Sequence, residues 1–139
     1  MDDIDRRSAF AFGMGAAASA LAAAPAAAAA AQARGPAAGK EVAPGVREIT
    51  LAEIPSTIPG FRMVRLLDYV LRPGAAIAPE AMEHPMVCHM LEGQLEVTKD
   101  AERFTARKND MWTCSAGTTE GDANKSKSVA IMRVVEFMA

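Results

Sequence analysis

The sequence lacks the features that a nucleic-acid-binding or membrane-surface protein needs. Fifteen basic and 17 acidic residues give a formal net charge of −2 over 139 residues, and no basic block is larger than the pair Lys125 and Lys127. Such a balance offers no electrostatic attraction for phosphate backbones or anionic lipids, so we expect no nucleic-acid partner. The chain also has no glycine-rich phosphate loop, no nucleophile elbow, no Cys-x-x-Cys and no internal repeat.

The N-terminal segment has the pattern of a targeting signal. Arg6 and Arg7 precede an alanine-rich stretch over residues 9–31, and Ala31-Gln32-Ala33 gives a small-x-small cleavage pattern before Arg34. This arrangement resembles a twin-arginine export signal, so we expect residues 1–33 to be a signal peptide and the protein to be periplasmic or otherwise exported. We expect no stable membrane span after cleavage. An uncleaved anchor is the alternative, because the stretch is long enough to span a bilayer.

Cysteine is scarce, with only Cys88 and Cys114. Two interpretations compete for an exported protein. The thiols are bridged, because the periplasm is oxidising, or they are buried and one or both act as metal ligands. The sequence does not fix the separation of their Cβ atoms, so both remain open.

The rest of the chain predicts short strands. Residues 34–45 hold three glycines and two prolines and are expected to form a flexible arm, followed by one domain over 46–139. Apolar runs broken by turn residues predict strands at 46–51, 61–71, 86–91, 94–98, 102–106, 111–114 and 129–137, with a polar loop at 118–128. Evenly spaced strands with no amphipathic helix predict an all-β antiparallel sandwich or barrel.

Residues 74–93 resemble the first signature of the cupins in spacing. Gly74 and Gly93 stand at its two ends, and every interval between them fits. The positions that normally hold His, His and Glu carry Glu80, Met82 and Met86.

Residues 109–124 resemble the second cupin signature. Gly117 and Asn124 match it, whereas Asn109 and Ser115 replace a glycine and a proline. Glu120 stands where the signature has its His.

The resemblance implies a double-stranded β-helix, the cupin jelly-roll barrel, with the signature side chains pointing inward from neighbouring strands. It also implies a homodimer. The segment 129–137 is apolar on both faces, which supports a dimer, although one barrel could bury it equally well.

The candidate site follows from the signatures and from strand periodicity. Side chains two residues apart share a strand face. We therefore expect Glu80, Met82, Met86 and Glu120 to be metal ligands, with Cys88, Met90 and His84 contacting a ligand, and His89 pointing outward. Thioethers and thiols favour Cu(I), so copper is the metal we expect if one is bound. Packing of a metal-free core is the alternative role for Met82, Met86 and Met90.

The two glutamates allow a second chemistry. Two inward carboxylates would repel each other and raise one pKa, which suits acid–base catalysis or binding of a cationic ligand.

Phe104 and Trp112 are expected to pack in the core or an interface. Arg62, Arg65 and Arg72 receive no chemical role.

The sequence therefore predicts an exported small cupin that binds a metal ion or a small molecule in its barrel. An enzyme using Glu80 and Glu120 as acid and base is one alternative. A metal-free binding or structural barrel, filled with side chains, is the other.

Overall fold

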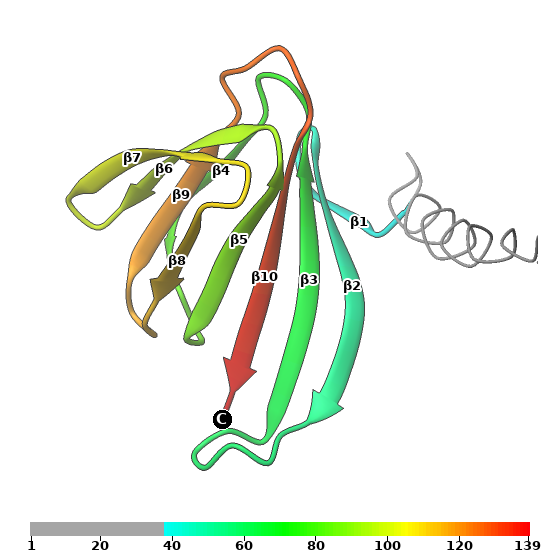
Figure 1. Cartoon of the computed structure of the whole chain (residues 1–139), viewed down its shortest axis with the longest axis vertical. Helices are drawn as coiled ribbons and strands as arrows, with labels where there is room; N and C mark the ends of the chain where they lie inside the picture. The colour runs from blue at the N-terminus through cyan, green and yellow to red at the C-terminus, as the bar shows by residue number, and fades with distance from the viewer. Residues whose placement is uncertain (1–37) are drawn as a thin grey trace, which may run out of the picture.

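Two antiparallel β-sheets face each other in the computed structural model, which describes residues 38–139 (Figure 1). The expected signal segment, residues 1–33, lies outside the described residues. The strands are β1 (Lys40–Ala43), β2 (Val46–Pro55), β3 (Met63–Leu71), β4 (Ala76–Ala81), β5 (Met86–Glu92), β6 (Gln94–Lys99), β7 (Glu102–Arg107), β8 (Met111–Cys114), β9 (Thr119–Ala123) and β10 (Ala130–Met138). Over residues 38–139 we find no helix long and apolar enough to cross a membrane.

The larger sheet has the strand order β1-β2-β3-β10-β5-β8, and the smaller has β4-β9-β6-β7. Consecutive strands alternate between the sheets at several points, which is how a jelly roll is wound. The expected all-β jelly roll is confirmed.

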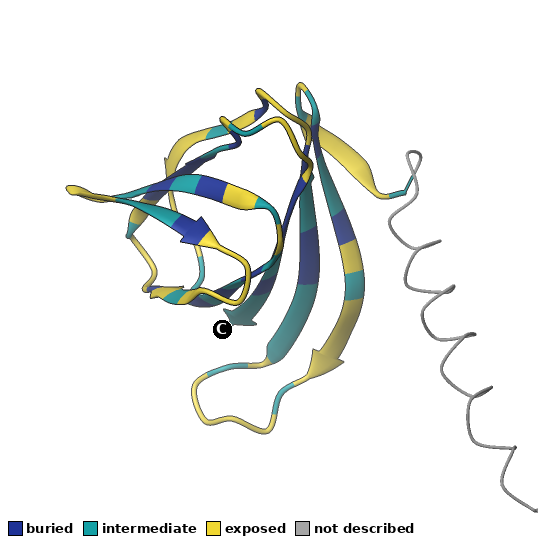
Figure 2. Cartoon of the chain, turned by 45° about the horizontal axis from the view of Figure 1, so that its top comes forward, coloured by how far each residue is buried: buried dark blue, intermediate teal, exposed yellow. Residues whose placement is uncertain are grey.

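The core lies between the sheets and follows the two-residue period of the strands. In β5 the side chains of Met86, Cys88 and Met90 are buried, whereas the positions between them are partly exposed. Leu95 and Val97 on β6 face them from the other sheet and are fully buried. Figure 2 shows this alternation as dark bands along the strands.

Two expected elements are wrong in part. Residues 40–43, placed in the flexible arm, form β1 and pair with β2. Residues 119–123, placed in a polar loop, form β9 and pair with β4 and β6. The sequence TEGDA hides a strand because its inward positions carry Glu120 and Asp122 rather than apolar residues, so the usual alternation is missing.

The last strand, β10, lies between β3 and β5 in the middle of the larger sheet. Both edges of β10 are therefore paired within one chain, so β10 is not an edge strand. The argument that a lone edge strand would not tolerate two apolar faces therefore no longer supports a dimer, and the dimer stays a prediction.

Residues at the glycine and asparagine positions of the two signatures form turns and connect neighbouring segments. Asn109 has a φ of 73°, the left-handed conformation that glycine usually supplies, and asparagine tolerates it. Asn124 is buried, and its side-chain amide donates to the carbonyls of Leu71 and Ser128. The backbone NH of Gly74 donates to the carbonyl of Asn124 at 2.8 Å, so the ends of the two signatures are tied together.

Candidate functional site

A cavity of about 580 Å³ lies between the two sheets. Its lining comes from β1–β5, β9, β10 and the segment that joins β4 to β5. Exposed lining residues such as Glu80 and Glu83 connect it to solvent. Its volume lies within the range of small-molecule sites in proteins.

Six of the seven residues expected at the site line this one cavity, which are Glu80, Met82, His84, Met86, Cys88 and Glu120. Met90 does not. Its side chain is fully buried in the hydrophobic core, two residues beyond Cys88 on β5. His89 is also absent from the lining.

An irregularity in β4 places Glu80 on the cavity face. Ile77 is opposite Asp122 and Glu80 is opposite Glu120, so three residue steps on β4 match two on β9. The extra residue lets Ile77 and Glu80 face the same side, which a regular strand would forbid. Gly121 lies opposite this bulge, and a Cβ atom there would lie 2.7–2.9 Å from three atoms of Pro79. Glycine is therefore the residue that β9 needs at this position.

Glu120 is buried and held by three donors. The indole Nε1 of Trp112 donates to Oε2 at 3.0 Å, and the thiol of Cys114 donates to the same oxygen. The thiol of Cys88 lies 4.0 Å from Oε1. These contacts explain how a glutamate that is 3% exposed is accommodated inside the barrel. Trp112 packs edge-on against Phe104, as expected for core aromatics.

The two cysteines are buried free thiols on neighbouring strands. Cys88 is opposite Trp112 and Cys114 is opposite Met86, so both side chains lie on one face of the β5–β8 pair. A hydrogen bond with Cys114, together with burial, raises the pKa of the Cys88 thiol above its ordinary value. Cys88 is therefore a protonated thiol rather than a thiolate at neutral pH.

Asp122 is the other buried acid of β9. It is 5% exposed, and among the described residues its Oδ1 is the one buried side-chain oxygen or nitrogen without a hydrogen-bond partner. Burial and the nearby charge of Glu120 raise the pKa of Asp122 to about 8. Asp122 is thus an acid that holds its proton near neutral pH.

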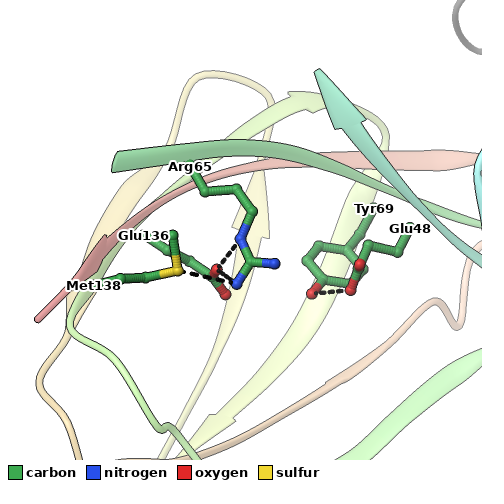
Figure 3. Close-up of polar contacts among 5 residues, drawn as sticks. All are labelled: Glu48, Arg65, Tyr69, Glu136 and Met138. Carbon is green, nitrogen blue, oxygen red and sulfur yellow. Dashed lines mark hydrogen bonds and ion pairs between the residues drawn. The ribbon is translucent and has the colours of Figure 1, made fainter. Parts of the chain in front are cut away.

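The larger sheet contributes two polar pairs to the cavity, shown in Figure 3. Tyr69 of β3 is directly opposite Glu48 of β2, and its hydroxyl donates to Glu48 at 2.8 Å. Arg65 of β3 is opposite Glu136 of β10 and forms a 3.0 Å ion pair with it. Burial and the bond to Glu48 raise the pKa of Tyr69.

Arg65, for which the sequence predicts no chemical role, lies in the cavity wall. Glu48, Tyr69, Asp122 and Glu136 were also missed. One signal was available for β3, because Arg65 and Tyr69 are four residues apart on a strand and so share a face. No local signal linked either of them to Glu48 or Glu136, since those pairs depend on strand register.

The donor set does not fit the metal site that cupin signatures usually build. Among residues 38–139, no group of three or more His, Cys, Asp or Glu side chains is arranged to hold a metal ion. Both oxygens of Glu120 already face donors from the protein, and the histidine positions carry Met and Glu. The thioethers of Met82 and Met86 are the remaining soft ligands at the signature positions.

No family model and no curated protein matches this chain. Solved structures do match it. KdgF from a Halomonas species aligns with a TM-score of 0.60 and 17% identity over 72% of this chain and 86% of that chain. An RmlC-like cupin from Shewanella frigidimarina aligns with a TM-score of 0.58 and 13% identity, covering 72% of this chain and 82% of that one. The cupin_2 domain of an XRE-family transcriptional regulator from Enterobacter cloacae gives 0.58 and 15%, covering 68% and 98%.

These likenesses show the fold. The chain is a small protein with a cupin barrel, similar to cupin_2 domains.

Proposed function

We propose that this protein binds a small organic molecule inside its barrel. The observation that carries the proposal is the cavity of about 580 Å³, which reaches solvent and is lined by polar groups from both sheets. A barrel that served only as a scaffold would be filled by side chains, as protein interiors normally are. Well-formed cavities with a few convergent polar groups are the usual sites of small-molecule binding.

The geometry supports an organic ligand better than a metal ion. A transition-metal site needs three or four ligands arranged around one point, and the described residues hold no such group of His, Cys, Asp and Glu. A copper ion bound through Met82 and Met86 is the competing proposal. The two make different predictions for the methionine side chains.

Methionine methyl NMR separates them. Met82, Met86 and Met132 line the cavity, whereas the exposed Met111 does not. We expect fragments of a small-molecule library to shift the first three methyl signals and to leave Met111 unchanged. Cu(I) titrated alone is the matched probe for the metal proposal. Stoichiometric shifts of Met82 and Met86 with Cu(I), and none with any fragment, would replace our proposal with copper binding.

A cavity-filling variant provides the control. Ile77 lines the cavity and shares a face with Asp122, so Ile77→Trp should occupy the space and abolish the fragment-induced shifts. Ile54 is 57% exposed and outside the lining, so Ile54→Trp should leave them intact. Equal shifts in both variants would place the binding elsewhere.

A further inference from the structure

The cavity has a strong excess of acidic groups. Its lining includes six carboxyl side chains, Glu48, Glu80, Glu83, Glu120, Asp122 and Glu136. The basic groups in the same lining are Arg65 and His84. A low-dielectric enclosure with this balance attracts cations and repels anions.

Protein donors already serve three of these carboxyls. Arg65 pairs with Glu136, Tyr69 donates to Glu48, and Trp112 with two thiols faces Glu120. The protein itself stabilises these three carboxylates, so they do not require a ligand.

Asp122 is different because its buried Oδ1 has no partner. A buried acceptor without a donor costs roughly 1–3 kcal/mol, and such exceptions in native proteins call for an explanation. The strand partners of Asp122 supply none, since Ile77 and Val97 lie opposite it on β4 and β6. A donor from outside the protein would satisfy it, and Asp122 lines the cavity in which that donor would lie.

The remainder of the wall is soft and apolar. Met82, Met86 and Met132 line the cavity together with Ile77 and Val134. Thioethers adapt to irregular shapes and make favourable contacts with aromatic rings. A ligand that satisfies both parts of the wall therefore has a charged donor at one end and an apolar or aromatic body.

From this arrangement we propose that the ligand is a small organic cation, with a protonated amine or guanidinium head that donates to Asp122 and an apolar body packed on the methionines. This inference rests on the proposed function, and it names the ligand class for the same cavity. Glu80 and Glu120, which lie opposite each other two residues along β9 from Asp122, add to the negative potential around this head group.

Three probes of similar size and different charge test it, namely phenethylamine, 2-phenylethanol and phenylacetate. We expect the amine to bind about tenfold more tightly than the alcohol or better, since a hydrogen bond to a charged group contributes about 1.5–3 kcal/mol. The acid should show no binding. Titrations followed by the methionine methyl signals at about pH 8.5 keep the amine protonated and Asp122 ionised.

Asp122→Asn is the matched variant, because it keeps the side-chain shape and removes the charge. It should weaken amine binding about tenfold or more and change alcohol binding by less than about twofold. Glu102→Gln removes an exposed carboxylate on β7 outside the cavity and should change neither. Equal weakening of amine binding in both variants would show only a general effect of charge and would overturn the role of Asp122.

The outcomes distinguish this inference from the proposed function. Phenylethanol or phenylacetate binding in the cavity as tightly as the amine would overturn the cationic ligand and leave small-molecule binding in place. No binding of the three probes, while other fragments bind, would also overturn it. No binding of any fragment would remove the proposed function as well.

Discussion

Glu80 and Glu120 lie directly opposite each other on β4 and β9, with both side chains on the cavity face. They differ sharply in surroundings. Glu80 is exposed, whereas Glu120 is buried and faces Trp112, Cys114 and Cys88. The same substitution at the two positions therefore measures how far the fold depends on the buried carboxylate.

Glu120→Ala should lower the free energy of unfolding by about 2 kcal/mol, because the indole NH and the thiols lose their acceptor inside the barrel. Glu80→Ala should change it by less than about 0.5 kcal/mol, as for most exposed sites. Urea unfolding followed by the fluorescence of Trp112, the single tryptophan, measures both. Equal losses would mean that the contacts of Glu120 do not stabilise the fold.

Asp122 should make the protein less stable as the pH rises. Its pKa is raised to about 8 by burial and by Glu120, so the folded state holds a proton that the unfolded state releases near pH 4. The stability from that proton is complete below pH 4 and is lost as the pH rises towards 8, by at most about 5 kcal/mol. The melting temperature of Asp122→Asn, measured over the same range, should fall less steeply. Parallel curves for the two proteins would contradict the shift.

Gly121→Ala should destabilise the protein by about 1–3 kcal/mol, since the new Cβ must displace Pro79 in the β4 bulge. Thr119→Ala, on an exposed position of the same strand, is the control and should have little effect. Adding Pro79→Ala to Gly121→Ala should recover part of the loss. If the double variant is no more stable than Gly121→Ala, strain between these residues is not the cause.

Both thiols should resist alkylation in the folded protein, because Cys88 and Cys114 are 0% and 2% exposed and the pKa of Cys88 is raised. In urea without a reductant, we expect two alkylated thiols per chain by mass spectrometry. No alkylation in urea would reveal a disulfide, and rapid alkylation without urea would contradict the burial.

The export signal is a prediction from sequence alone. Replacing Arg6 and Arg7 by lysine should trap the precursor in the cytoplasm of a bacterium with a twin-arginine pathway, whereas Arg34→Lys should not. Cell fractionation followed by immunoblotting of the chain measures this. Unchanged export of the double variant would exclude the twin-arginine route.

The sequence was most informative where local chemistry determines local structure. Asn109 stands where the cupin signature has a glycine and adopts the left-handed conformation that glycine would supply, and the spacing of Gly74, Gly93, Gly117 and Asn124 resembled a cupin barrel. Strand periodicity also brought Met86 and Cys88 to one face. Met90 shares that periodicity but lies beyond the cavity, because a strand face is longer than the cavity that it borders.

The rest of the site depends on pairings between distant segments. The sequence did not predict that Asp122 lies on a strand, because β9 lacks the usual apolar alternation. Glu136 contacts Arg65 only because of the register in which β10 pairs with β3. The absence of the usual histidines indicated that the metal chemistry had changed. It could not indicate that the cavity would be acidic, since two of the six lining carboxyls, Glu48 and Glu136, come from outside the signatures.

The position of β10 has a consequence for how the protein is made. Because β10 joins β3 to β5, the larger sheet cannot be completed until residues 130–138 have left the ribosome. Until then, β2 and β3 expose an unpaired edge on the side that β10 will occupy, and such edges promote aggregation. During synthesis, the edge of β3 would therefore need protection from aggregation until β10 pairs with it.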